Sequence, residues 1–295
     1  MRMRRSLFTV LVATLVAALL TAGSAAARPG GEQGVKRYVA LGDSYTSGPL
    51  IPLQRPDPAG CLRSTNNYPA LLARALRVKS YTDVSCAGAD TTDMTRPQEI
   101  PLGHNRPQFD ALRPNTDLVT LGIGGNDHGV FGSVVGTCPE LRESDPEGAP
   151  CRAYFTVDGV DTLRAAIADT GENVAAVLAG IHERSPRARV LVVGYPRIAP
   201  PTGTCPDVLP FADGDYAWLN EIEAALNAAL AKAAADDGRS EFVDTYPASL
   251  GHDACAGAAA WIQGKDTDPL AAATYHPRRS GMAGVATVLH RYLTS

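Results

Sequence analysis

The chain has 295 residues, of which 45% are hydrophobic and 20% are charged, and its formal net charge is −4 at pH 7. A chain of this length and composition can bury a core in one large or two small domains, and disordered and collagen-like architectures are excluded. Outside the extreme N-terminus no block of lysine and arginine occurs. The sequence therefore lacks the basic face of a nucleic-acid-binding protein, and we expect no nucleic-acid partner.

Residues 1–27 have the organisation of a secretory signal peptide. A positively charged segment is followed by an apolar stretch from Leu7 to Leu20 and by an A-x-A cleavage signature at residues 25–27. The apolar stretch is short for a membrane-spanning helix, so an uncleaved membrane anchor is the weaker alternative. We expect a secreted protein that retains no membrane span after cleavage, with residues 28–295 as its mature part.

Apolar runs along the mature chain predict the strands of a parallel sheet. The clearest runs consist of hydrophobic residues without polar alternation and end at a glycine, which is typical of strands buried on both faces. The run nearest the C-terminus is a shorter and weaker example of the same pattern. These runs predict strands over residues 37–41, 117–121, 189–193 and 241–243, and a further strand is expected around residues 79–83, before Ser85.

Helical patterns lie between these runs and after the last one. Hydrophobic residues at three- and four-residue steps predict helices over residues 69–76, 161–185 and 215–237, and Ser280 is expected to cap a last helix. Strands that alternate with helices indicate a layered α/β fold. No internal repeat or linker interrupts the pattern, so we expect residues 28–295 to form a single domain.

Two long segments without periodicity, residues 45–66 and 128–158, are rich in glycine, proline and cysteine. We expect them to be loops, and loops of this length in a compact domain are usually functional. Both follow the carboxyl end of a predicted strand, where open α/β sheets bind their ligands. The sequence therefore places the functional site at this edge of the sheet.

The six cysteines all lie in the mature part of the chain. An even number of cysteines in an exported protein indicates disulfides. No two of them have C-x-x-C spacing and no histidine pair accompanies them, so we expect no metal site. Several connectivities are possible, and sequential pairing is expected because it closes the shortest loops. The expected pairs are Cys61 with Cys86, Cys138 with Cys151, and Cys205 with Cys255.

A serine follows the first predicted strand, in the turn Gly-Asp-Ser-Tyr-Thr-Ser-Gly of residues 42–48. Ser44 is therefore placed for nucleophilic attack at the sheet edge, although a free hydroxyl is a weak nucleophile that needs a base. On its own, this position would better fit a helix cap. The chain contains no G-x-S-x-G sequence, which argues against the nucleophile elbow of α/β-hydrolases.

Three further short segments change this interpretation. They are Ser-Cys-Ala-Gly-Ala at 85–89, Gly-Ile-Gly-Gly-Asn-Asp at 122–127 and Thr-Tyr-His-Pro at 274–277. With the Gly-Asp-Ser of 42–44, they resemble the four signature blocks of the GDSL or SGNH hydrolase superfamily in order and spacing. Residues 38–44 are similar to the secreted actinobacterial, Streptomyces-type lipases and esterases of that superfamily. The resemblance implies a three-layer α/β/α sandwich around a flavodoxin-like, five-stranded parallel sheet.

The resemblance also implies a role for each site residue. Ser44 would be the nucleophile and His276 the general base, while the N–H groups of Ser44 and Gly88 and the side-chain amide of Asn126 would form the oxyanion hole. Fixed neutral donors of this kind stabilise the negative charge of a tetrahedral acyl intermediate without adding a counter-charge. A glycine at position 88 lets the backbone approach the substrate closely.

One position departs from the pattern of the superfamily. Many members carry an aspartate three residues before the histidine to orient the imidazole, and this chain has Ala273 there. We expect a Ser–His dyad in which a backbone carbonyl, most simply that of Ala273, accepts the imidazole N–H. Asp266 or Asp268 is the alternative partner of His276. His128, two residues after Asn126, is the competing histidine.

We therefore interpret the chain as a secreted serine esterase or lipase that hydrolyses carboxylic esters through an acyl-enzyme on Ser44. The glycine-rich segment 122–127 lacks the third glycine and the later acidic residue of a dinucleotide-binding loop, so no cofactor is expected. The expected partner is a small-molecule or lipid ester, and the expected state is a monomer.

Three alternative functions follow from the same residues. A phospholipase A or a carbohydrate deacetylase would use the same scaffold and the same chemistry. A catalytically silent extracellular binding module would keep the fold alone. Residues 50–53, just after the nucleophile, are expected either to form an apolar wall for an acyl chain or to pack in the core.

Overall fold

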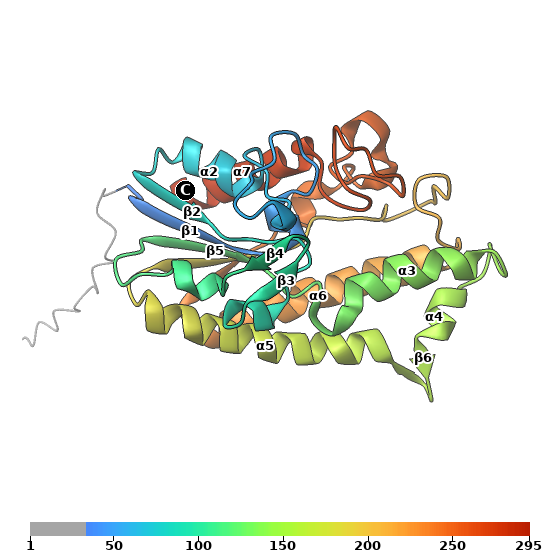
Figure 1. Cartoon of the computed structure of the whole chain (residues 1–295). Helices are drawn as coiled ribbons and strands as arrows, with labels where there is room; N and C mark the ends of the chain where they lie inside the picture. Colours follow the sequence, from blue (N-terminus) through green and yellow to red (C-terminus); the bar gives the residue numbers. More distant parts are fainter. Residues whose placement is uncertain (1–33) are drawn as a thin grey trace, which may run out of the picture. The chain divides into compact units, whose positions relative to one another are not determined.

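A five-stranded parallel sheet organises residues 34–295, the part of the chain that the computed structural model describes (Figure 1). The strands lie in the order β2-β1-β5-β8-β9, and each neighbouring pair is parallel. Their bounds are β1 Arg37–Gly42, β2 Ser80–Asp83, β5 Leu118–Gly122, β8 Arg189–Val193 and β9 Ser240–Val243. The predicted strands are confirmed, and the expected signal peptide, residues 1–27, lies outside the described residues.

Helices cover both faces of the sheet, as the predicted three-layer architecture requires. In Figure 1, α2 (Tyr68–Ala75) and α7 (Arg279–Thr294) lie above the sheet, while α5 (Thr162–Arg184) and α6 (Asp215–Asp237) lie below it. Successive strand residues point to opposite faces. In β8, accordingly, Val190 packs in the core on the α5–α6 side, and Leu191 packs in the core on the α2–α7 side. This explains why the three central strands, β1, β5 and β8, are mostly apolar.

The remaining elements lie in the connections. Segment 128–158, expected to be a loop, contains α3 (Val130–Arg142) and α4 (Pro150–Tyr154), so that expectation is wrong. α3 escaped prediction because only Val130 and Cys138 of its residues are fully buried, and the helix contains Pro139. The other short elements are α1 Ser44–Ser47, β3 Gln98–Ile100, β4 Gly103–Asn105, β6 Thr156–Val157 and β7 Val160–Asp161.

The ends of the long helices follow from their sequences. The Asp161 side chain accepts the N–H groups of Leu163 and Arg164 and caps α5. Gly238 takes the left-handed conformation that ends α6. Ser280 does not cap the last helix as expected, because α7 begins at Arg279 and the Ser280 hydroxyl donates to the carbonyl of Ala260 at 2.8 Å.

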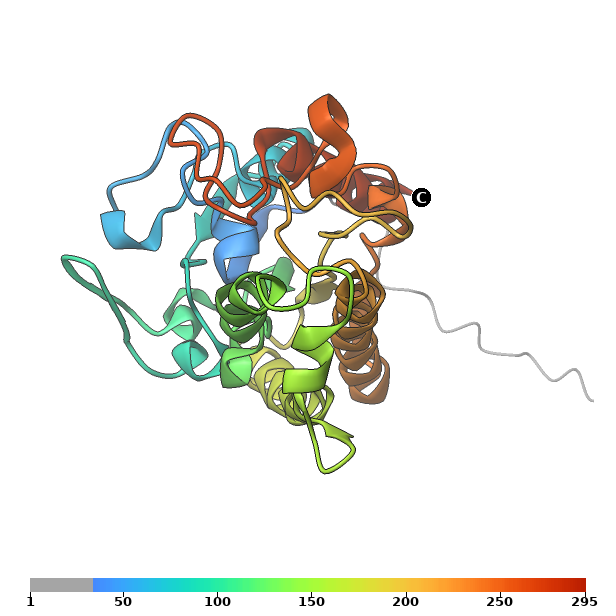
Figure 2. The same ribbon diagram turned by 90° about the vertical axis from the view of Figure 1, so that its right-hand side faces the viewer.

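Three disulfides cross-link the connections. The structure pairs Cys61 with Cys86, Cys138 with Cys151 and Cys205 with Cys255, which is the sequential pairing. Between residues 34 and 295 no helix is long and apolar enough to cross a membrane. In Figure 2, the blue loop after β1, the teal β3–β4 hairpin and the red loop before α7 lie on the same side of the molecule.

Candidate active site

The first candidate residue lies where β1 gives way to α1. The Asp43 N–H donates to the carbonyl of Gly122 at 2.9 Å, and the Asp43 carboxylate accepts the Tyr45 N–H at 2.8 Å and caps α1. Ser44 is the first residue of α1 and is 5% exposed. A Cβ at Gly42 would lie 2.5 Å from the Gly122 carbonyl oxygen, so only glycine fits where the two strands end together.

Two donors that the oxyanion hole would need lie in neighbouring loops. Gly88, after β2, has a φ of +79°, a left-handed conformation that favours glycine. Asn126, after β5, donates one side-chain N–H to the carbonyl of Ala89 at 2.8 Å, which holds this amide beside the Gly88 loop. Within residues 34–295 the backbone N–H groups of Ser44 and Gly88 have no hydrogen-bond partner. Both remain available to a ligand.

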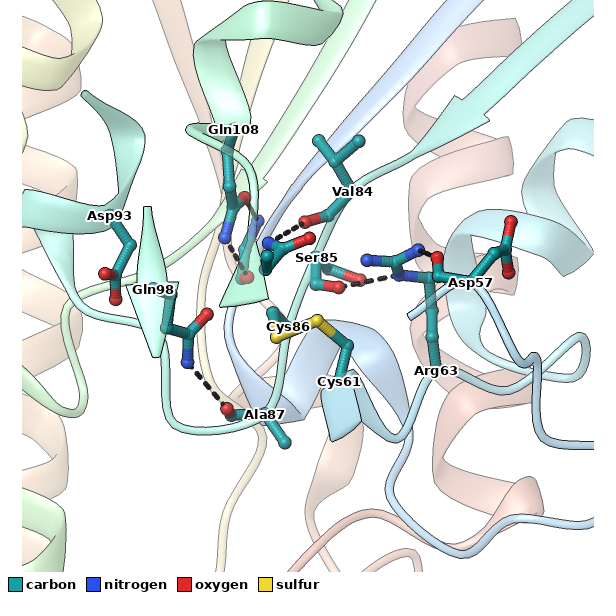
Figure 3. Close-up of a disulfide and its surroundings, with 12 residues drawn as sticks. Asp57, Cys61, Arg63, Val84, Ser85, Cys86, Ala87, Asp93, Gln98 and Gln108 are labelled. Carbon is teal, nitrogen blue, oxygen red and sulfur yellow. Dashed lines mark hydrogen bonds between the residues drawn. A yellow bond between two sulfur atoms is a disulfide. The ribbon is translucent and has the colours of Figure 1, made fainter. Parts of the chain in front are cut away.

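The loop between β2 and Gly88 is held by side chains as well as by a disulfide. Figure 3 shows Arg63 and Gln98 reaching this loop from opposite sides. The Arg63 guanidinium donates to the carbonyl of Ser85 at 2.7 Å, and the Gln98 amide donates to the carbonyl of Ala87 at 2.9 Å. Because Cys86 lies between these two residues and is bonded to Cys61, the loop is fixed at three consecutive positions.

The candidate base has one defined proton position. The His276 Nδ1 lies 2.6 Å from the carbonyl oxygen of Thr274. A carbonyl oxygen only accepts, so Nδ1 carries the proton and Nε2 of the neutral ring keeps its lone pair. The ring lies 5.5 Å from the Tyr45 ring and 5.6 Å from the Phe131 ring, centroid to centroid. Burial lowers the pKa of His276 below its ordinary value, which keeps the ring neutral near pH 7.

The carbonyl that holds His276 is not the expected one. The carbonyl of Ala273 accepts the backbone N–H of His276 at 3.1 Å, so it is used within the turn. Tyr275 has a φ of +57°, and this left-handed residue lets the chain turn the Thr274 carbonyl toward the ring. Neither expected aspartate, Asp266 or Asp268, makes a contact with His276 in the described part of the chain.

The loop containing His276 is joined by a hydrogen bond to the turn that contains Ser44. The Tyr45 hydroxyl donates to the carbonyl of Tyr275 at 2.7 Å. Tyr45 follows Ser44 and Tyr275 precedes His276, so this bond joins the neighbours of the two candidate residues. The competing histidine, His128, is exposed and lies 3.5 Å from the side-chain amide of Asn173.

Asp127 joins its own turn to two other parts of the chain. Its carboxylate accepts the N–H and the hydroxyl of Thr91 at 3.0 and 2.5 Å. It also accepts the side-chain amide of Asn173 at 3.0 Å. The residue next to Asn126 is thereby joined to α5 and to the segment that follows Gly88.

Ser44 and Asn126 are among the residues that line a cavity. Its walls are mostly apolar side chains of α3 and α6, among them Val130, Phe131, Val134, Leu219, Ile222 and Leu226. Residues 50–53 do not line it, because Ile51 packs in the core on the α2–α7 side and Leu53 is 71% exposed. The cavity can therefore hold an apolar chain next to Ser44.

The acidic side chain of Glu223 interrupts the apolar lining that α6 contributes. The Glu223 carboxyl group on α6 accepts the backbone N–H of Ile198 at 3.1 Å, and burial raises its pKa to about 8. At neutral pH the group is therefore mostly uncharged, which suits an apolar cavity. Between residues 34 and 295 no group of His, Cys, Asp or Glu is arranged to hold a metal ion.

Sequence reasoning missed two residues of the site. Thr274 contributes only its backbone carbonyl, and every residue has one, so no side-chain pattern marks it. Tyr195, which lines the cavity beside Ser44, lies two residues after β8 and outside all four signature blocks. Its only signal is its place after a predicted strand, at the edge where ligands bind.

Comparison with known proteins finds one family and several bacterial relatives. Residues 40–283 match the model of the GDSL-like Lipase/Acylhydrolase family. Lipase 2 of Streptomyces coelicolor is 40% identical over 262 residues, which cover 86% of this chain and 85% of that protein. An esterase of Streptomyces scabiei is 34% identical over 301 residues, covering 89% of this chain and 87% of the relative.

Two crystal structures share the fold along almost their whole length. Phospholipase A1 from Streptomyces albidoflavus NA297 is 32% identical, with a TM-score of 0.71, and the match covers 87% of this chain and 99% of that one. The extracellular lipase from Streptomyces rimosus is also 32% identical, with a TM-score of 0.72 and the same two coverages.

Proposed function

Because the chain belongs to the GDSL-like lipase/acylhydrolase family and is a carboxylic ester hydrolase, we propose that it is a secreted serine esterase with Ser44 as nucleophile and His276 as general base. One observation carries the proposal. The Thr274 carbonyl holds the Nδ1–H of His276, which leaves the Nε2 lone pair as the base. A serine hydroxyl needs such a base to become a nucleophile.

The proposed reaction has two halves. Nε2 of His276 takes the proton of the Ser44 hydroxyl while the oxygen attacks the ester carbonyl carbon. The tetrahedral intermediate collapses, the bond to the alcohol oxygen breaks, and the imidazolium returns the proton to the leaving alcohol. Water then attacks the acyl-enzyme with the same help from His276, which releases the acid and restores Ser44.

The oxyanion of each tetrahedral intermediate would be stabilised by three neutral donors. They are the free backbone N–H groups of Ser44 and Gly88 and the second side-chain N–H of Asn126, whose first donates to Ala89. Removing one such donor in studied serine hydrolases costs roughly 3 kcal/mol of transition-state stabilisation. Donors held in advance need no reorganisation during the reaction, and the fixed loop of Figure 3 supports that role.

The apolar cavity supports a substrate with an extended acyl chain. The apolar side chains of α3 and α6 that line it fit an acyl chain longer than acetyl, so a carbohydrate deacetylase is not proposed. A phospholipase A is the second candidate, because one relative with a solved structure is a phospholipase A1. Both candidates share the acyl-enzyme chemistry and differ in the alcohol that leaves.

Secretion is supported by two independent features. The signal-peptide organisation of residues 1–27 predicts export of a mature domain from residue 28 to residue 295. All six cysteines are paired in three disulfides, which persist in oxidising compartments.

Hydrolysis of p-nitrophenyl esters from acetyl to palmitoyl, with EDTA present, tests the proposal. We expect wild-type activity to survive EDTA and Ser44→Ala to abolish it, because the alanine variant has no nucleophile. Ser47→Ala is the matched control, since Ser47 is buried in the same short helix and its hydroxyl has no hydrogen-bond partner among the described residues. The chain length with the highest kcat/KM separates an esterase from a lipase.

Two results would contradict the proposal. Activity that survives in Ser44→Ala would exclude Ser44 as the nucleophile. Absence of activity on every ester would favour a catalytically silent binding module. Fatty-acid release from phosphatidylcholine vesicles, measured beside the nitrophenyl esters, decides whether a phospholipid is the better substrate.

A further inference from the structure

One buried hydroxyl group joins the two backbone segments that precede Ser44 and Asn126. The Tyr195 hydroxyl accepts the N–H of Gly125 at 2.9 Å and donates to the carboxylate of Asp43. Gly125 is the residue before Asn126, and Asp43 is the residue before Ser44. Tyr195 is 6% exposed, so water does not compete freely for these bonds.

The tyrosine that bears this hydroxyl is itself held firmly. The side-chain amide of Asn227, on α6, accepts the Tyr195 N–H at 2.8 Å and donates to the Tyr195 carbonyl at 3.0 Å. The Tyr195 ring also packs edge-on against the Tyr45 ring, at 5.2 Å between centroids. The Tyr195 hydroxyl group is therefore held in a defined position relative to both neighbouring backbone segments.

The donors and acceptors around the Tyr195 hydroxyl decide which group receives its hydrogen. A tyrosine hydroxyl has one hydrogen to give, and an ionised carboxylate can only accept. Asp43 therefore takes that hydrogen, and the oxygen lone pairs are left to accept the N–H of Gly125. If either bond were lost, the backbone segment that it joins to Tyr195 would lose one restraint on its position.

On the premise of the proposed function, we propose that Tyr195 is a positioning residue, whose hydroxyl sets the distance between the nucleophile Ser44 and the oxyanion donor Asn126. These two residues follow different strands, β1 and β5, and their relative placement decides whether the amide reaches the oxyanion. Donors stabilise a transition state only when they lie at hydrogen-bond distance from the charge that develops. A misplacement of about 1 Å can cost roughly 100-fold in rate.

The charge state of Asp43 gives this role a pH signature. Burial raises the pKa of Asp43 to about 7, while the hydrogen bonds from Tyr195 and Tyr45 lower it and the nearby Asp127 raises it. Removal of the Tyr195 hydroxyl therefore raises this pKa further. Below it, Asp43 is protonated, and the charge-assisted bond from the Tyr195 hydroxyl becomes a weaker bond between neutral groups.

Tyr195→Phe tests the role, because it removes the hydroxyl and keeps the ring and the bonds to Asn227. We expect kcat to fall roughly 10- to 100-fold with KM changed less than about threefold. The acid limb of the pH profile of kcat/KM should move to higher pH. Tyr38→Phe is the matched control, since it removes another buried hydroxyl, 2.7 Å from the hydroxyl of Thr120 and away from the cavity.

The outcomes separate this inference from the proposed function. A kcat of Tyr195→Phe equal to that of Tyr38→Phe overturns the inference. So does a loss of kcat that follows the melting temperature and leaves the acid limb unmoved, because that marks a purely structural hydroxyl. Ser44→Ala is measured alongside: if it is inactive, these outcomes concern Tyr195 alone, and if it is active, the proposed function and the inference both fail.

Discussion

A backbone carbonyl, rather than a carboxylate, selects the tautomer of His276. The bond from Nδ1–H to the Thr274 carbonyl is 2.6 Å long, and Asp268 instead accepts the N–H of Leu270 within its own loop. The sequence predicted a carbonyl at this point, since Ala273 stands where an aspartate is common. It could not identify Thr274, because the choice depends on the left-handed conformation of Tyr275.

Neutralising either nearby aspartate should therefore leave catalysis almost intact. We expect Asp266→Asn and Asp268→Asn to retain most of the wild-type kcat on a p-nitrophenyl ester. Neutralising the aspartate of a catalytic triad, by comparison, lowers kcat by roughly 10⁴-fold. A loss of that size in either variant would show that an aspartate orients His276, and the proposed dyad would be wrong.

The buried carboxyl group of Asp43 should cost the protein stability at neutral and higher pH. Its pKa is raised from 3.8 to about 7 by burial, so between these values the folded protein holds a proton that the unfolded chain has lost. The free energy of unfolding contributed by this group consequently falls as pH rises through that window. Each unit of pKa difference corresponds to about 1.4 kcal/mol.

Asp43→Asn removes this titration and should flatten the pH dependence. As pH rises from 4 to 8, the free energy of unfolding of wild type should fall relative to that of the variant. We expect this relative change to reach up to about 4 kcal/mol. Urea unfolding at the two pH values measures the gain. Asp158→Asn, an exposed aspartate, is the control. An equal pH dependence in wild type and Asp43→Asn would contradict the assigned burial cost.

At the scale of elements, the loop between β2 and Gly88 depends on its cross-link more than the sheet does. Cys86 is bonded to Cys61, its N–H donates to the carbonyl of Gly42, and the carbonyl of Cys61 accepts the N–H of Ala87, both at 3.0 Å. The sheet strands are held by their own ladders and cores. Loss of the disulfide should therefore disturb the donor of Gly88 before it disturbs the fold.

Removing this disulfide should separate activity from secondary structure. For Cys61→Ala with Cys86→Ala, we expect kcat to fall roughly tenfold or more while far-UV circular dichroism stays that of wild type. The paired variant Cys138→Ala with Cys151→Ala removes a disulfide of the α3–α4 region and should lower kcat less. Simultaneous loss of activity and circular dichroism in the first variant would refute the local role.

Periodicity predicted the strands and the long helices that build the core, α6 included, and missed α3, which lines the cavity. The three central strands were visible because they are buried on both faces and are mostly apolar. α3 was not, because Phe131 and Val134 face a cavity and the helix lacks the regular apolar stripe of a core helix. α6 lines the same cavity but also packs in the core along its length, so its apolar pattern remained visible.

At the scale of the whole molecule, the parallel sheet brings together parts of the chain that are far apart in sequence. β1 and β5 end side by side, with Gly42 opposite Gly122, so Ser44 and Asn126 follow adjacent strands. The signature blocks predicted which residues lie at this edge but not what joins them. Tyr195 and Asn227 do that through single hydrogen bonds between elements, and such pairings leave no pattern along the chain.

The amide of the Thr274 backbone has one property that a catalytic carboxylate lacks: it does not take up a proton at any pH at which proteins stay folded. In the proposed mechanism, the Thr274 carbonyl therefore accepts the Nδ1–H of His276 equally well in acid. The aspartate of a triad, by contrast, loses its charge as the solution becomes acidic. Before the reaction begins, the proposed catalytic groups, Ser44, His276 and the three donors, are also electrically neutral. Charge separates only while the oxyanion and the imidazolium coexist, and each then serves as the other's counter-ion.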